Sequence, residues 1–272
     1  MKIKYLGTAA YEGVPSLFCN CPACKKAKML GGRNLRSRSQ ALINGELLLD
    51  FGPDTVWHFL KYGFDWENIC GCLITHSHSD HLYPEDIRMA AEYYTHEHRT
   101  VRFYSARSGY DKIKEVADKA GEGVEVTLIE AGKRFTVGKY DVLPMWANHS
   151  AGTSPVIYSI GCGDKKMLYA HDTGIFPERT WELLKREGRY DLLSLDCTGC
   201  LGLGGDWVDE HMSFGTVLKT VKRLREEGLA DDKTVIVINH FSHNYGQVYD
   251  EMLEEAERHG ITVSYDGLEI EF

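Results

Sequence analysis

The sequence lacks any long hydrophobic run, any low-complexity tract and any excess of positive charge. A helix that spans a bilayer needs about 20 consecutive apolar residues, and no segment approaches that length. Acidic residues outnumber basic ones by 40 to 31, and the net charge of −9 argues against a protein that coats nucleic acid or an anionic membrane. Residues 1–6 alternate like a first strand and lack the apolar core of a signal peptide. We therefore expect a cytoplasmic protein.

Proline is also scarce, with 7 residues, and no Pro- or Ser-rich linker divides the 272 residues. One α/β domain over residues 1–272 is expected, and it is long enough to bury a large core. The eight cysteines do not resemble a disulfide framework in a chain of this size. In a reducing compartment they are thiols or metal ligands.

Short apolar or alternating runs recur between helical patterns, which is typical of an α/β fold. Asn44-Gly45 and Gly163-Asp164 lie between paired runs and predict hairpin turns, and Gly63 closes the first helical pattern. Helices are predicted at 55–62, 85–94, 109–120, 177–186, 213–227 and 247–259. Strands are predicted at 2–6, 39–43, 46–50, 70–75, 101–104, 124–129, 140–145, 156–161, 166–170, 192–196, 234–239 and 261–265.

The most informative segment follows the apolar run 69–74. Residues 76–81 read His-Ser-His-Ser-Asp-His, which places His76, His78, Asp80 and His81 in one loop after a strand. Neutral imidazoles and carboxylates are the usual nitrogen and oxygen ligands of Zn, Mn or Fe. Because a strand that runs into a loop can turn such side chains toward one point, this segment predicts a metal site.

Three further candidate ligands each follow a predicted strand. His149 comes after 140–145, Asp172 after 166–170 and His240 after 234–239. A single histidine in such a place is more often a hydrogen-bonded structural residue than a ligand. Three candidates in series, behind the dense first cluster, favour ligands over a loop that is rich in histidine by chance.

The pattern His-x-His-x-Asp-His, with the later His, Asp and His, resembles the metallo-β-lactamase-fold hydrolases over nearly the whole chain. Asp50-Phe51-Gly52 resembles the first motif of that superfamily, an aspartate at a strand end followed by a glycine turn. One departure is Leu82-Tyr83-Pro84, where many members place a glycine after the last histidine. The resemblance implies an α/β fold of four layers, an αββα sandwich, with metals at one edge of the two sheets.

The resemblance further implies two metals, each with three ligands of its own and one shared: His76, His78 and His149 for the first, Asp80, His81 and His240 for the second, and Asp172 as the bridge. Metals about 3.5–4 Å apart can share a hydroxide, which would be the nucleophile at neutral pH. Asp50 is expected behind the ligands, where it would fix the tautomer of one imidazole. Zn and Mn, and also Fe and Ni, suit these ligands.

A separate motif, Cys19-Asn20-Cys21-Pro22-Ala23-Cys24, places three thiols within six residues. Cys-x-Cys-x-x-Cys is typical of three ligands of a structural zinc, which needs a fourth. The fourth is either His243, three residues after His240, or a thiol of Cys197 or Cys200. A redox pair or plain buried thiols are the other interpretations of 197–200.

The option with His243 resembles one branch of the superfamily, the carbon–phosphorus lyase accessory phosphodiesterases (the PhnP family), which hold a structural zinc. In the phosphodiesterase branch a histidine ahead of a helix faces the scissile phosphate, and His211, before the predicted helix 213–227, matches it. His211 is expected to stabilise the transition state or to protonate the leaving oxygen. We count it and Asp80 as catalytic candidates; an ordinary histidine at the start of a helix is the alternative for His211.

These motifs together predict a metal-dependent hydrolase, a phosphodiesterase with two catalytic divalent metals and one structural zinc. A small cyclic or linear phosphodiester suits the acidic chain better than a long nucleic acid or a membrane, and no insertion resembles the flexible arm of the tRNA-processing relatives. The basic segment 33–38 favours a solvated loop over a phosphate-binding segment. The sequence does not determine the oligomeric state, although a homodimer is the commonest oligomer.

Two other functions remain open. The same hydroxide attacks a carbonyl carbon in a lactone, thioester or β-lactam hydrolase. A non-catalytic zinc protein, whose site is only a scaffold, belongs to a different class.

Overall fold

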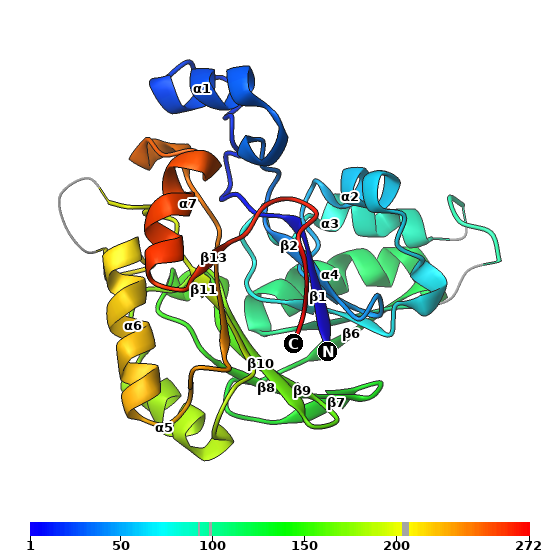
Figure 1. Ribbon diagram of the computed structural model, residues 1–272. Helices are drawn as coiled ribbons and strands as arrows, with labels where there is room; N and C mark the ends of the chain where they lie inside the picture. The colour runs from blue at the N-terminus through cyan, green and yellow to red at the C-terminus, as the bar shows by residue number, and fades with distance from the viewer. Residues whose placement is uncertain (92, 98–99, 203–206) are drawn as a thin grey trace.

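The computed structural model describes residues 1–91, 93–97, 100–202 and 207–272. Two seven-stranded sheets face each other, and helices cover both outer faces (Figure 1). The four-layer αββα sandwich predicted from the sequence is therefore confirmed. Within the described parts of the chain, every helix is too short or too polar to span a bilayer.

The first sheet has the strand order β14-β1-β2-β3-β4-β5-β6. Its strands are β1 (Lys2–Gly7), β2 (Gln40–Ile43), β3 (Leu47–Leu49), β4 (Gly71–Ile74), β5 (Val101–Ser105), β6 (Val124–Leu128) and β14 (Glu269–Glu271). The second sheet has the order β13-β12-β11-β10-β9-β8-β7. Its strands are β7 (Phe135–Val137), β8 (Tyr140–Trp146), β9 (Val156–Cys162), β10 (Lys165–Ala170), β11 (Leu192–Asp196), β12 (Val235–Asn239) and β13 (Thr262–Val263).

Both sheets follow the same pairing pattern, although the sequence contains no visible repeat. The pairs from β14 to β3 are antiparallel and those from β3 to β6 are parallel. In the second sheet the pairs from β7 to β10 are antiparallel and those from β10 to β13 are parallel. Because parallel strands end at the same edge of a sheet, the loops after β3, β4, β10, β11 and β12 come together there.

Helices α2 (Thr55–Tyr62), α3 (Pro84–Ile87) and α4 (Arg107–Ala120) cover the first sheet. Helices α5 (Glu178–Glu187), α6 (Phe214–Glu226) and α7 (Tyr249–Arg258) cover the second, and α1 (Pro22–Leu30) lies at the end of the molecule above α7 in Figure 1. Short 3₁₀ turns lie at Gly32–Asn34, Trp66–Asn68, Arg88–Ala90, Gly121–Gly123, Ala151–Thr153 and His243–Tyr245.

The two faces of each sheet are both buried, so the strands are apolar almost throughout. Leu47 and Leu49 pack between the sheets, while Leu48 points to the helix layer. In the second sheet Val237 packs between the sheets, and Ile236 and Ile238 point to α6 and α7. The side-chain period of two in a strand explains this division.

The predicted strands lie within two residues of the observed ones, and the same holds for five of the six predicted helices. Both predicted hairpin turns are present: Asn44 and Gly45 have positive φ, and so does Gly163, as tight hairpin turns require. Helix α1 and strands β7 and β14 are not among the predicted elements. The two strands have only three residues each, too few for a clear alternation.

The helix predicted at 85–94 is wrong. The structure has α3 over only four residues, then the 3₁₀ turn Arg88–Ala90, and Ala91 is extended. Thr95 Oγ1 donates a hydrogen bond to the Met89 carbonyl. In a continuing helix, the amide four residues after Met89 would donate to this carbonyl instead. Residue 92 of the predicted helix lies outside the described residues.

Gly52 lies where the loop after β3 passes the histidine loop 76–81. The Phe51 amide donates to the His81 carbonyl at 2.8 Å, and the Tyr83 amide donates to the Phe51 carbonyl at 2.7 Å. A Cβ at residue 52 would lie 2.0 Å from the Asp80 carbonyl oxygen. Only glycine therefore permits this approach of the two backbones.

Gly52→Ala should displace the histidine loop and lower the free energy of unfolding by about 1–3 kcal/mol or more, because the clash is with backbone. Urea unfolding measures the change. Gly152→Ala is the control, since a Cβ there would meet no atom within 4 Å; it should stay within about 0.5 kcal/mol of wild type. Equal stability of the two variants would contradict the interpretation of Gly52.

Candidate active site

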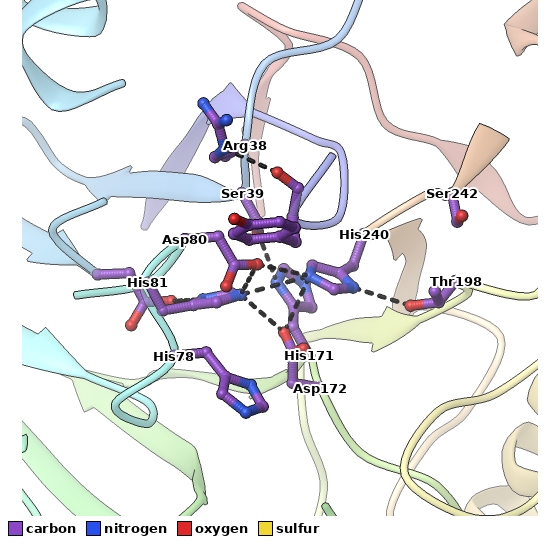
Figure 2. A network of polar contacts seen from close by, with 12 residues as sticks. Arg38, Ser39, His78, Asp80, His81, His171, Asp172, Thr198, His240 and Ser242 are labelled. Carbon is purple, nitrogen blue, oxygen red and sulfur yellow. Dashed lines mark hydrogen bonds and ion pairs between the residues drawn. The ribbon is translucent and has the colours of Figure 1, made fainter. Parts of the chain in front are cut away.

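The seven predicted ligands converge at the edge of the sandwich where the parallel strands end. They come from the loops after β4, β8, β10 and β12, so four separate parts of the chain contribute. Figure 2 shows Asp80, His81, Asp172 and His240 pointing toward one another, with His78 beside them. The structure brings together the whole predicted set: His76, His78, Asp80, His81, His149, Asp172 and His240.

His76, His78 and His149 form the first group. His78 Nδ1 lies 2.9 Å from His76 Nε2 and 3.2 Å from His149 Nε2. Each pair of rings is close to perpendicular, with interplanar angles of 80°, 83° and 85°. Three ring nitrogens that face one common point are typical of histidines around a metal ion.

Asp80, His81 and His240 form the second group. His81 Nε2 lies 3.2 Å from Asp80 Oδ2 and 3.3 Å from His240 Nε2. His240 Nε2 lies 4.0 Å from the same Asp80 oxygen. The three ligand atoms therefore share one small, buried volume.

Asp172 lies between the two groups and turns one oxygen to each. Its Oδ1 is 4.0 Å from His76 Nε2 and 3.9 Å from His149 Nε2, and its Oδ2 is 3.1 Å from Nε2 of both His81 and His240. Burial raises the pKa of this carboxyl, but the imidazoles of His240, His81 and His76 outweigh burial and hold the pKa well below its usual range. Among the described residues, no hydrogen bond of normal geometry reaches the buried Oδ2. An ionised, unsatisfied oxygen here fits a bridging metal ligand.

Asp50 lies behind the second group, at the end of β3, and is fully buried. Its Oδ2 accepts a hydrogen bond from His81 Nδ1 at 2.7 Å, and its Oδ1 accepts one from the Thr75 amide at 2.8 Å. The first bond keeps the proton on His81 Nδ1 and leaves Nε2 free for a metal. The position agrees with the tautomer-fixing role expected of this residue.

Asp196 is a second buried carboxylate that the sequence analysis missed. It accepts hydrogen bonds from the amides of Asp172 and Met212 at 3.0 and 2.9 Å, and it lies 3.0 Å from His211 Nδ1. A signal was available, because Asp196 ends a predicted apolar strand in the way that Asp50 follows one. Burial raises its pKa, but the charge of His211 and the hydrogen bond to it outweigh burial and lower the pKa.

His211 lies above the second group. Its ring stacks on the ring of His240, with centroids 5.6 Å apart and an angle of 14°. Burial lowers the pKa of His211, but the Asp196 carboxylate outweighs burial and raises the pKa to about 9. The Asp196 carboxylate therefore favours the protonated form of His211, the form that can donate a proton.

A cavity of about 450 Å³ opens above these residues. His78, Asp80, His149, Asp172, His211 and His240 all contribute to its floor and wall. The Glu210 carbonyl, 3.1 Å from His149 Nδ1, holds that imidazole in place, and Glu210 itself has a positive φ of 61°. Sequence analysis did not single out Glu210, because a backbone carbonyl leaves no side-chain signature.

The thiol cluster lies apart from this cavity floor, at the start of α1. The ligand atoms of Cys19, Cys21, Cys24 and His243 all lie within 4.8 Å of one another, and Cys21 Sγ is 3.5 Å from His243 Nδ1. Burial raises the pKa of the Cys21 thiol, but the Cys24 amide and the His243 ring outweigh burial and lower the pKa to about 6. Four such atoms suit a closed zinc site.

Of the two alternatives for the fourth ligand, the structure brings His243 to the thiols. Cys197 and Cys200 are buried in the core behind the second sheet. Cys200 Sγ lies 3.5 Å from the Ser242 carbonyl, and all eight cysteines are free. The buried-thiol interpretation therefore describes this pair in the structure.

The basic segment 33–38 is not the solvated loop that the sequence favours. Arg36 is 5 % exposed, and its Nη1 donates to Thr8 Oγ1 at 2.8 Å and to the Ser264 carbonyl at 2.7 Å. Arg38 forms an ion pair with Asp54 at 3.0 Å. Arg36 thus joins the N- and C-terminal segments, and Arg38 binds the residue before α2. Neither arginine is among the described residues that line the cavity.

A family model for the β-lactamase superfamily domain matches residues 46–236. That range is most of the chain, so the protein belongs to the β-lactamase superfamily. The match includes the parallel strands β3 to β6 of the first sheet and β10 and β11 of the second. It also includes all but one of the seven converging side chains; only His240 lies beyond it. The family resemblance expected from the histidine motif is confirmed.

Particular relatives are distant. Ribonuclease Z of Picrophilus torridus is 23 % identical over 167 residues, which cover 58 % of this chain and about half, 53 %, of that protein. Among solved structures, Zn²⁺-bound PqqB from Methylobacterium extorquens is similar with a TM-score of 0.77 and 19 % identity over the whole of both chains. A diphosphatase from the PhnP family has a TM-score of 0.72 and 22 % identity over 100 % of this chain and 97 % of that one. At such identities these structures show the fold.

Cys21→Ser should remove one zinc and lower the stability of the protein before it lowers any activity, because structural zinc contributes directly to folding. Elemental analysis and the thermal unfolding midpoint measure the two effects. Cys72→Ser is a matched control, a buried thiol outside the cluster. An anomalous-scattering map at the zinc edge that shows no peak beside Cys19, Cys21 and Cys24 would rule the site out.

Proposed function

We propose that the protein is a metal-dependent phosphodiesterase that hydrolyses a small phosphodiester at a pair of divalent cations. The observation that carries the proposal is Asp172, whose two oxygens face the two groups of imidazoles. His76, His78 and His149 would hold one cation, and Asp80, His81 and His240 the other. Zn or Mn suits these nitrogen and oxygen donors, and Fe or Ni is compatible with them.

Divalent cations bound there supply a water nucleophile at neutral pH, because they lower its pKa from 15.7 to about 7, and they offset the charge of the phosphate. The chain's own residues do the rest. Asp50 and Asp196 hold the ligands in place before substrate arrives, so the site needs little rearrangement. The protonated His211, on the cavity wall, donates its proton to the leaving oxygen.

The small size of the cavity supports a small substrate. It measures about 450 Å³, which is in the range of ordinary small-molecule sites. With a net charge of −9, the chain has no general attraction for a polyanion. Among superfamily members, a diphosphatase of the PhnP family and human tRNase Z share the fold, with TM-scores of 0.72 and 0.63.

An assay panel tests the proposal. Bis(p-nitrophenyl) phosphate and 2′,3′-cyclic nucleotides represent phosphodiesters, and a homoserine lactone, a thioester and nitrocefin represent carbonyl substrates. We expect turnover of the phosphodiesters, with metal added back after chelation. Turnover of a carbonyl substrate alone would replace the proposal with a lactone, thioester or β-lactam hydrolase, and no turnover with metal bound would favour a scaffold.

Asp172→Ala should abolish turnover and reduce the bound catalytic metal, because the side chain serves both groups, while the fold stays largely intact. Elemental analysis, the thermal unfolding midpoint and the assay are the three measurements. Asp164→Ala, in the hairpin turn after β9, is the control for loss of one carboxylate. Two metals retained at wild-type affinity in Asp172→Ala would contradict the bridging role.

His211→Ala should lower kcat by about 10²–10⁴, the usual contribution of a general acid, with metal content unchanged. His259→Ala, which changes an exposed histidine on the far end of α7, should leave kcat as in wild type. A loss confined to metal binding in His211→Ala would mean that the residue is a ligand and not a proton donor.

A further inference from the structure

The wall of the cavity above the proposed metal ligands carries carboxylates, and His211 is the one basic side chain of its described lining besides the proposed ligands. Glu12 and Glu210 both line it, and no lysine or arginine does so among the residues that the structure describes. Three aromatic residues, Tyr11, Trp207 and Tyr245, and neutral polar residues such as Ser242 and Asn244 also line it. Apart from His211 and metals on the cavity floor, the described wall residues therefore offer no cation to a second phosphate or carboxylate of a substrate.

Glu12 is held firmly in this wall. Its Oε1 accepts hydrogen bonds from Ser242 Oγ and from Asn244 Nδ2, the latter at 3.3 Å, and lies 3.8 Å from His243 Nε2. Its Oε2 accepts no hydrogen bond from the described residues, and the side chain is 22 % exposed. One carboxylate oxygen is thus fixed on the segment that joins His240 to the thiol cluster. Glu12 lines the cavity and also a neighbouring pocket that Arg33 and Arg36 line.

Accepting the phosphodiesterase function proposed above, we propose that Glu12 is a specificity-determining residue that disfavours substrates with a second negative charge. The scissile phosphodiester, with its single charge, lies over the metals and away from the wall. A further phosphate or carboxylate on the substrate that lies against the part of the wall formed by Glu12 meets a fixed negative charge. Two like charges about 4 Å apart already weaken binding about fivefold in bulk water, and more in a partly desolvated cavity.

Two chromogenic probes that differ by one phosphate test this selection. The first is the p-nitrophenyl ester of thymidine 5′-phosphate, and the second is the same ester with an added 3′-phosphate. Wild type should prefer the first probe in kcat/KM. Glu12→Gln should reduce this preference about fivefold or more, through a lower KM for the second probe, because the amide keeps an oxygen for Ser242 and Asn244 but loses the charge.

Asp209→Asn is the matched control. It removes one exposed carboxylate beside Glu210 that does not line the cavity, so it changes the net charge equally. Its preference between the probes should equal that of wild type. Glu12→Asp, which restores the charge, should recover most of the discrimination, which a merely structural role of Glu12 would not predict.

Direct binding separates this proposal from the proposed function. Calorimetry with thymidine 5′-phosphate and thymidine 3′,5′-bisphosphate on the metal-loaded protein needs no turnover. If neither probe is hydrolysed but Glu12→Gln narrows the difference between the two ligands, the charge selection stands and the phosphodiesterase function fails. The proposed charge selection is overturned if Glu12→Gln discriminates between the two probes, or between the two ligands, as strongly as wild type and Asp209→Asn do.

Discussion

Two buried carboxylates, one at the end of a strand in each sheet, hold the candidate active site together. Asp50 and Asp196 are both fully buried, where an ionised carboxylate without partners would cost several kcal/mol. Their hydrogen bonds offset that cost, in part for Asp50, whose pKa burial still raises. The donors belong to the loops that carry the site: Thr75 and His81 for Asp50, and Asp172, Met212 and His211 for Asp196. The loops can therefore change conformation only by leaving a buried charge unsatisfied.

Backbone strain coincides with the same positions. Asp50, Asp172 and His240 have φ values of 68°, 51° and 66°, in the left-handed region that non-glycine residues rarely adopt. Each such residue costs about 1–3 kcal/mol, which the two apolar cores and the carboxylate hydrogen bonds offset. The result is a set of side chains that point inward before any metal or substrate binds, as efficient stabilisation of developing charge requires.

Several features that the sequence did not predict depend on partners outside the local pattern. Asp196 orients Asp172 and His211, but no spacing rule links a strand-end aspartate to residues 24 and 15 positions away. Arg36 looked solvated because the local sequence is basic, yet Thr8 and Ser264 bind it in the interior. The end of α3 was placed too late because Thr95 takes a carbonyl of the preceding turn. A local sequence pattern does not show which groups from other parts of the fold will bind these side chains and carbonyls.

The sequence by itself determined the alternation of strands and helices and the identity of the clustered ligands. Both follow from short-range rules: a short continuous apolar run indicates a strand that is buried on both faces, and several imidazoles in one loop indicate a metal. Only the tertiary structure decided that His243, and not Cys197 or Cys200, joins the thiols, and that Glu12 faces the catalytic cavity. Those outcomes depend on the packing of the two sheets, because this packing decides which loops lie within a few ångströms of one another. The packing in turn depends on contacts from the whole chain.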